Sequence, residues 1–148
     1  MSGTIQAICI SGEKGVVKEP VASAELRPEH GLVGDAHAGP WHRQVSLLAA
    51  ESIAKIKAAL PDLADGAFAE NIVTEGVDLL AVPVGGRLLL GDGVELEVTQ
   101  IGKECHNSCA IKQQTGDCVM PREGIFCRVI QGGLLKKGDP IRISLPAD

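Results

Sequence analysis

Short runs of alternating apolar and polar residues recur along the chain. The clearest is Val94-Glu-Leu-Glu-Val-Thr99, which follows the apolar run Arg87-Leu-Leu-Leu90 and the turn Gly91-Asp-Gly93. Strict alternation is typical of a strand with one buried face, and a short glycine-containing turn between two such runs predicts a β-hairpin. Further strands are predicted at Thr4–Ile10, Val16–Val21, Ser23–Pro28, Ile125–Ile130 and Asp139–Leu145. The second of these is short, and we expect Pro20 to end it. These patterns favour a mostly β fold.

One segment has helical rather than alternating spacing. Ser46 is a suitable N-cap and Pro61 a suitable stop. The apolar residues that recur near one helical face are Leu48, Ile53, Ile56 and Leu60. We therefore expect a helix that packs over the sheet. Two other segments lack periodicity: Glu29–Trp41 predicts an ordered glycine-rich loop, and Val73–Val84, which contains Pro83, predicts a connection with an edge strand.

The composition narrows the choice of fold and partner. Aromatic residues make up only 2% of the 148 residues, while 18 glycines and 8 prolines provide many turns. We therefore expect one compact domain over residues 1–148, a barrel or sandwich with an aliphatic core. The net charge of −5 argues against general binding to nucleic acid or to a membrane surface, since both require a positive field. No run of about 18 apolar residues and no signal-peptide pattern is present, so we expect no membrane insertion and a cytoplasmic location.

The cysteines are concentrated in one stretch. Four of the five lie within Gln100–Gly133, directly after the alternating strand. Without a secretion signal, an odd number of cysteines favours thiols in a reducing compartment over a disulfide framework. Cys9 lies in an apolar run and Cys127 in a predicted strand, so we interpret both as buried structural thiols. Candidate chemistry is therefore expected at the remaining three.

The spacing Cys105-His-Asn-Ser-Cys109, followed by a later cysteine, leaves three interpretations open. One is a zinc site, although Cys-x3-Cys with a lone third cysteine is not a standard zinc spacing. Its ligands would be Cys105, His106, Cys109 and Cys118. Alternatively, the thiols are incidental residues of a polar loop. In the third interpretation one thiol is reactive, because cations such as Lys103 and Arg122 can lower a thiol pKa.

The polar loop before the predicted helix is a second candidate site. It gathers Asp35, His37, His42 and Arg43 among glycines. Glycines let backbone approach a ligand closely, and histidines are donors whose charge is adjustable near neutrality. The alternative is an ordinary solvated loop. Asn71, a polar residue in an otherwise apolar run, either satisfies buried backbone groups or orients a ligand.

Several motifs occur in a fixed order along the chain. They are Gly31-Leu-Val-Gly-Asp-Ala-His37, His42-Arg-Gln-Val-Ser46, Phe68-Ala-Glu-Asn-Ile72, the cysteine segment with Met120-Pro-Arg-Glu-Gly-Ile-Phe126, Val129-Ile-Gln-Gly-Gly133 and Lys137-Gly-Asp-Pro-Ile-Arg-Ile143. Together they resemble the MOSC domain, the molybdenum cofactor sulfurase C-terminal domain family. The resemblance implies a compact β-barrel-like domain, similar to the β-barrel domain of pyruvate kinase, with one or two packing helices.

The resemblance also implies a cofactor and a reactive residue. MOSC domains are associated with a molybdenum pterin cofactor or its tungsten counterpart, and a loop cysteine carries sulfur or ligates the metal. Soft thiolate ligands suit such a role. Cys109, which precedes Ala110 and Ile111, best matches that cysteine, with Cys105 as the earlier partner. The spacing here is Cys-x3-Cys, where the sulfurase enzymes have Cys-x2-Cys.

The cofactor ends in a phosphate, which requires cationic and backbone donors. The cofactor-binding residues that the resemblance implies are His37, His42, Arg43, Asn71, Lys103 and Arg122. The implied function is carriage of sulfur or cofactor through the loop cysteine, with enzymes of cofactor synthesis or acceptor molybdoenzymes as partners. The sequence lacks the pyridoxal-phosphate desulfurase region of the sulfurase enzymes, so we expect that it does not extract sulfur from cysteine itself. Two alternatives stay open: a molybdenum-dependent reductase of N-hydroxylated compounds, and a non-catalytic partner in cofactor maturation.

Overall fold

The computed structural model describes residues 2–13, 18–36, 38–41, 43–57, 70–102 and 124–144. The strands are β1 (Ser2–Ile10), β2 (Glu19–Val21), β3 (Ser23–Arg27), β4 (Gly31–Leu32), β5 (Val45–Ala49), β6 (Ile72–Glu75), β7 (Arg87–Leu90), β8 (Val94–Ile101), β9 (Ile125–Gln131), β10 (Gly133–Lys136) and β11 (Pro140–Ser144). The helices among these residues are α1 (Ala50–Lys57) and the 3₁₀ helix η1 (Leu79–Ala81). The described chain is therefore mostly β.

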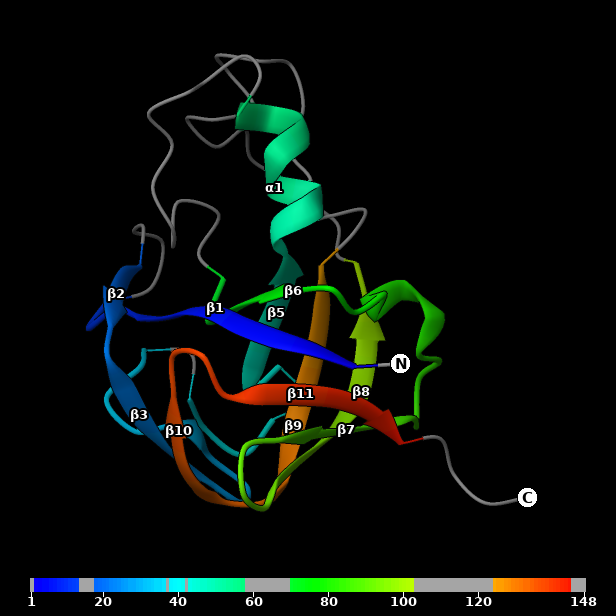
Figure 1. Cartoon of the computed structure of the whole chain (residues 1–148). Helices are drawn as coiled ribbons and strands as arrows, with labels where there is room; N and C mark the ends of the chain where they lie inside the picture. Colours follow the sequence, from blue (N-terminus) through cyan, green and yellow to red (C-terminus); the bar gives the residue numbers. More distant parts are fainter. Residues whose placement is uncertain are drawn as a thin grey trace.

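The main sheet closes on itself as a barrel (Figure 1). Its strand order is β11-β7-β8-β9-β5-β6-β1-β2, and β11 also pairs with β1, so seven of the described strands form a closed ring. Strands β5 and β6 are parallel, and the other pairs of this sheet are antiparallel. A smaller sheet, β10-β3-β4, lies beside the barrel. The expected compact β-barrel fold is confirmed.

The inside of the barrel is filled by aliphatic side chains. Along β8, Val94, Leu96 and Val98 are at most 2% exposed, while the residues between them are partly exposed. This is the alternation that predicted the strand, and the hairpin with β7 has the predicted three-residue turn. Branched and unbranched aliphatic residues suit a pleated, closely packed interior, which explains why so few aromatic residues suffice.

Three of the predicted elements need correction. Ser46 is not a helix N-cap: it lies in the middle of β5, and the helix begins at Ala50. The segment after Val73 does not form an edge strand, because β6 lies between β5 and β1 within the barrel. Pro20 does not end the second strand but pairs with Cys9 inside β2. It is tolerated there because β2 is at the edge of the sheet, where a missing amide hydrogen leaves no partner unpaired.

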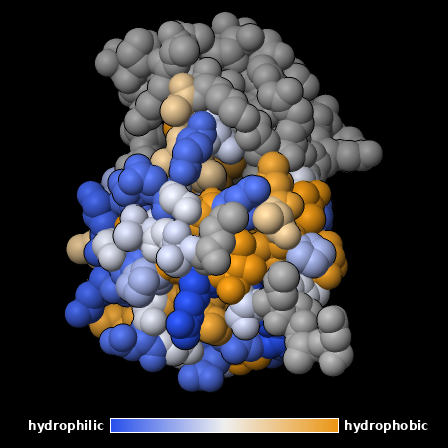
Figure 2. Space-filling model, turned by 45° about the vertical axis from the view of Figure 1, so that its right-hand side comes forward, coloured by the Kyte–Doolittle hydropathy of each residue, from blue (hydrophilic) through white to orange (hydrophobic). Residues whose placement is uncertain are grey.

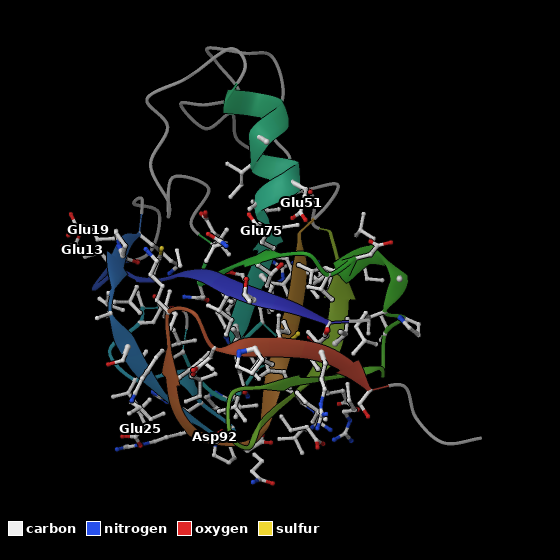
Figure 3. The ribbon with its side chains drawn as sticks, in the orientation of Figure 1. Glu13, Glu19, Glu25, Glu51, Glu75 and Asp92 are labelled. Carbon is white, nitrogen blue, oxygen red and sulfur yellow. The ribbon has the colours of Figure 1, made fainter. Side chains whose placement is uncertain are left out.

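The short helix α1 stands at one end of the barrel (Figure 1). Ile53 is 4% exposed and anchors it, and Glu51 accepts a hydrogen bond from Gly76 N at 2.9 Å. Figure 3 labels Glu51 and Glu75 at the foot of the helix, and Glu25 and Asp92 at the other end of the barrel. In the part of the chain that the structure describes, no helix is long and apolar enough to cross a bilayer.

The face turned forward in Figure 2 carries an apolar area next to charged surface. Exposed large apolar side chains among the described residues include Leu80 in η1 and Val84 just after it, which are 44% and 61% exposed. Isolated exposed apolar residues are common on protein surfaces, so these two by themselves indicate no binding site.

Candidate functional site

The segment with the candidate cysteines leaves and re-enters the barrel at one point. It connects β8 to β9, and Ile101 at the end of β8 pairs with Ile125 at the start of β9. One residue further out, Gly102 N donates a hydrogen bond to Gly124 O at 2.7 Å. Figure 1 shows these strand ends on the α1 side of the barrel. Any site formed by segment 103–123 is therefore tethered at this pair of strand ends.

Arg43 lies against both of those strands. Its Nε donates a hydrogen bond to Gln100 Oε1 at 3.0 Å, and its Cζ lies 5.2 Å from the centre of the Phe126 ring. Trp41 flanks the same guanidinium, with its ring centre 6.0 Å from Cζ. Within the described residues the Nε bond is the only hydrogen bond of this side chain, so its two terminal nitrogens have donors to offer a ligand. The half-buried Arg43 is thus a fixed cation beside the tether of the cysteine segment.

A bulge in β8 is what turns Gln100 toward Arg43. Strict alternation would place Gln100 on the inner face with Val98, but the pairing with β9 shifts between these two residues. As a result Val98 pairs with the core residue Cys127, whereas Gln100 pairs with Phe126 on the outer face. Gln100 Nε2 also donates to Gly102 O at 2.7 Å, which fixes the amide with its oxygen toward Arg43. Bulges of this kind commonly re-aim a side chain next to a functional site.

Gln44 fixes the backbone that carries Arg43. It is 1% exposed, and its Oε1 accepts a hydrogen bond from Val129 N at 2.9 Å. Gly31 packs against the same backbone: a Cβ built on it would lie 2.5 Å from Gln44 O, and its φ is +118°. Only glycine suits such a position, because other residues would meet both backbone strain and a steric clash. The loop is therefore clamped at its junction with β5.

A buried ion pair holds the middle of this loop. Lys18 Nζ lies 2.6 Å from Asp35 Oδ1, and both side chains are fully buried. Ser11 N donates to the same oxygen at 3.0 Å, and Lys18 also donates to Ser11 Oγ at 3.2 Å. Burial raises the pKa of the Asp35 carboxyl. The hydrogen bonds from Lys18 and Ser11 and the charge of Lys18 have a larger, opposite effect, so that the pKa lies below its usual range. Asp35 is thus an ionised anchor for the glycine-rich loop.

Asn71 joins three strands beneath that anchor. Its Oδ1 accepts hydrogen bonds from Ser46 N and Ser46 Oγ, at 3.0 and 3.2 Å, and its Nδ2 donates to Cys9 O at 3.1 Å. A hydrogen bond from Asn71 also contributes to lowering the pKa of Asp35. Asn71 is 1% exposed, so it satisfies buried backbone groups, one of the two roles expected for it. A direct contact with a ligand stays a prediction.

These groups share the outer face of one part of the barrel wall. Gln100 pairs with Phe126, Phe126 pairs with Ser46, and Ser46 is bonded to Asn71, which is bonded in turn to Cys9. The row runs from β8 across β9 and β5, and then past the start of β6 at Asn71 to β1. Arg43 lies at one end of it and the Lys18–Asp35 pair contacts the other. The structure therefore brings the predicted glycine-rich loop and the ends of the cysteine segment together on one side of the barrel wall.

Of the predicted reactive and cofactor-binding residues, the structure describes two, Arg43 and Asn71. The others lie outside the described residues, namely His37, His42, Lys103, Cys105, Cys109 and Arg122, and so do His106 and Cys118 of the zinc interpretation. Among the described residues no group of three or more His, Cys, Asp or Glu side chains is arranged for a metal ion. Nothing in the sequence singles out Gln100 or Lys18, because a bulge and a long-range ion pair have no local signature. Phe126 could have been found as one of only two phenylalanines, next to the cysteine segment.

The prediction of buried structural thiols is confirmed for both cysteines concerned. Cys9 and Cys127 are fully buried. Burial, with a smaller contribution from the charge of Glu97, raises the pKa of the Cys127 thiol far above its usual value. A buried thiol of this kind is inert, so any reactive thiol of this chain must be one of the other cysteines.

Comparison with known proteins agrees with this architecture. The structure superimposes on YuaD from Bacillus subtilis with a TM-score of 0.81 at 18% identity, covering 99% of this chain and 98% of that one. YiiM from Geobacillus stearothermophilus gives a TM-score of 0.70 at 18% identity (96% and 75% coverage), and YiiM from Escherichia coli gives 0.68 at 18% (99% and 71%). These likenesses establish the fold, and a search of curated protein sequences gave no significant match. The sequence profile of the MOSC domain matches residues 34–142, which include the second part of the glycine-rich loop and the whole cysteine segment, and the chain therefore belongs to the MOSC domain family.

Proposed function

We propose that this protein binds the molybdenum pterin cofactor, or its tungsten counterpart, and carries sulfur or the cofactor through a cysteine of segment 103–123. Membership of the MOSC family, which is associated with this cofactor, supports the first half of the proposal. Cys109 is assigned as the reactive thiol and Cys105 as its partner. Enzymes of cofactor synthesis and acceptor molybdoenzymes are the proposed partners.

The observation that carries the proposal is the position of Arg43. A phosphate-bearing cofactor needs a cation with donors that can reach the phosphate. Arg43 contacts Gln100 and Phe126, within three residues of either end of the cysteine segment, and its terminal nitrogens are uncommitted among the described residues. This donor set fits a phosphate despite the net charge of −5.

The chain's own residues would hold the cofactor in three ways. Arg43 would bind the phosphate, and Gln100 would keep the guanidinium in place through its bond to Nε. The Lys18–Asp35 pair would hold the glycine-rich loop against the barrel. When bound, the cofactor supplies a metal that can accept a thiolate or sulfur ligand.

The test is purification from a host that makes the cofactor, followed by analysis of bound metal and pterin. We expect the parent protein to retain both, and Arg43→Ala to weaken cofactor binding by about 1–3 kcal/mol, the range for losing a hydrogen bond to a charged group. Arg27→Ala is the matched control, because Arg27 is an exposed arginine paired with Glu25, which Figure 3 labels at the end of the barrel away from α1. It should retain cofactor as the parent does.

Cysteine variants test the second half of the proposal. Cys109→Ser should abolish sulfur loading or metal ligation without unfolding the protein, and Cys105→Ser should only reduce it. Absence of pterin from the parent protein would refute cofactor binding. Equal retention by parent and Arg43→Ala would show instead that the phosphate lies elsewhere.

A further inference from the structure

Trp41 is a large aromatic side chain in an unusual place. It is the only tryptophan of the chain, it lies in the glycine-rich loop two residues before Arg43, and it is 38% exposed. Its backbone is held in a tight turn, with Trp41 N donating to Gly39 O at 2.9 Å. The loop therefore presents part of an indole ring to solvent next to the candidate cofactor site.

The guanidinium of Arg43 connects this ring to the barrel wall. Its Cζ lies 5.2 Å from the centre of the buried Phe126 ring and 6.0 Å from the centre of the Trp41 ring, and Nε is bound to Gln100. The cation is thus held against two aromatic rings, one covered and one partly exposed. The indole and the guanidinium are therefore close enough for one ligand to contact both.

From this arrangement we infer that Trp41 and Arg43 together recognise a flat heteroaromatic ring bearing an anionic group, the ring stacking on the indole and the anion binding the guanidinium. The inference rests on the proposed function in one respect, because Arg43 is the anion contact in both. It adds a residue, Trp41, that binds the ring. Two sources share this chemistry: the pterin of the cofactor itself, or a separate purine-like ligand.

The two contacts should contribute separately to affinity. Stacking of a base on an aromatic side chain is worth roughly 10- to 100-fold in binding, and a charge-assisted contact to arginine a similar factor. A ligand with both features should therefore bind more tightly than either part alone.

The chain supplies its own reporter for this test. With one tryptophan and no tyrosine, selective excitation reports Trp41 alone. Cofactor-free protein is titrated with guanosine monophosphate, guanosine and ribose phosphate, which separate ring from anion. We expect guanosine monophosphate to quench Trp41 saturably and to bind at least about tenfold more tightly than either part. The same titration of cofactor-loaded protein identifies the source: lost binding assigns the site to the cofactor's pterin, and retained binding assigns it to a second ligand.

Variants followed by calorimetry complete the test. In Arg43→Ala, guanosine monophosphate should bind no more tightly than guanosine. In Trp41→Leu, it should bind no more tightly than ribose phosphate. Trp41→Phe should still bind guanosine monophosphate more tightly than ribose phosphate. Arg27→Ala should behave as the parent in all three titrations. The inference is overturned if guanosine monophosphate fails to bind the parent, or if it binds no better than ribose phosphate. Cofactor retention by the parent is measured independently, so that result would leave the proposed function standing.

Discussion

The buried Lys18–Asp35 pair allows a quantitative test of what holds the glycine-rich loop. Lys18→Met keeps most of the side-chain volume but leaves the fully buried Asp35 carboxylate without its cation. Breaking a buried pair in this way costs about 3–5 kcal/mol, because one charge stays desolvated and unpaired. We therefore expect Lys18→Met and Asp35→Leu each to lower the free energy of unfolding by about that amount in urea denaturation at neutral pH.

The double variant should recover much of this loss. With both charges removed, the desolvation cost disappears, and replacement of a buried pair by apolar residues is often neutral. One cost remains in the double variant: Ser11 N loses its acceptor Asp35 Oδ1. An unsatisfied buried donor destabilises the fold by about 1–3 kcal/mol. Lys18→Met/Asp35→Leu should thus be more stable than either single variant, although looser at the loop and poorer at retaining cofactor.

The pH dependence separates this mechanism from simple loss of packing. The folded-state pKa of Asp35 is below its usual value of about 4, so its stabilisation is present above that value and is lost as pH falls through the folded pKa. In Lys18→Met the unpaired carboxylate can instead take up a proton, so the deficit relative to the parent should shrink on acidification. If each single variant costs less than about 1 kcal/mol, as at an exposed pair, the reasoning from burial is refuted.

Two further predictions concern other parts of the barrel. Cys9 and Cys127 should resist alkylation in the native protein at neutral pH, because both are fully buried, and should react completely after denaturation. Labelling of either cysteine in the native state, detected by mass spectrometry, would contradict their core positions. Gly31→Ala should destabilise the protein by about 1–3 kcal/mol in thermal unfolding, since it adds a Cβ at positive φ against Gln44 O, whereas Gly12→Ala, whose Cβ meets nothing within 4 Å, should be nearly neutral. Equal unfolding midpoints for the two glycine variants would argue against the clamp at Gln44.

The strands were predictable where buried and exposed positions alternate along the chain, because one face of such a strand lies in the core and the other does not. The hairpin from Arg87 to Ile101 has this pattern, and the structure reproduces it. The run Val45–Ala49 is different: it is buried on both faces of the wall, and a short run without alternation is compatible with either a helix or a strand. Its identity is decided by long-range partners, namely pairing with β6 and β9 and the bonds between Ser46 and Asn71.

The candidate site was predictable in its parts but not in its assembly. Motifs singled out the glycine-rich loop and the cysteine segment, and the structure shows Arg43 beside the strand ends that bear that segment. Gln100 links Arg43 to these strand ends. Its position depends on a one-residue shift in the pairing of β8 with β9, whereas strict alternation would place its side chain inside the barrel. Similarly, the sequence separates Lys18 from Asp35, and they become neighbours only where the glycine-rich loop packs against Ser11, just after β1.

Closure through β1 and β11 has a consequence for how the protein folds. Ser2 pairs with Arg142, so the last seam of the barrel joins the two extremes of the described sequence. Loops of that length are slow to close, and folds dominated by such contacts refold on millisecond to second timescales. On the ribosome the barrel cannot be completed until β11 has emerged, and until then β1 and β7 expose unpaired strand edges. Rapid association of β11 should therefore protect the nascent chain from aggregation.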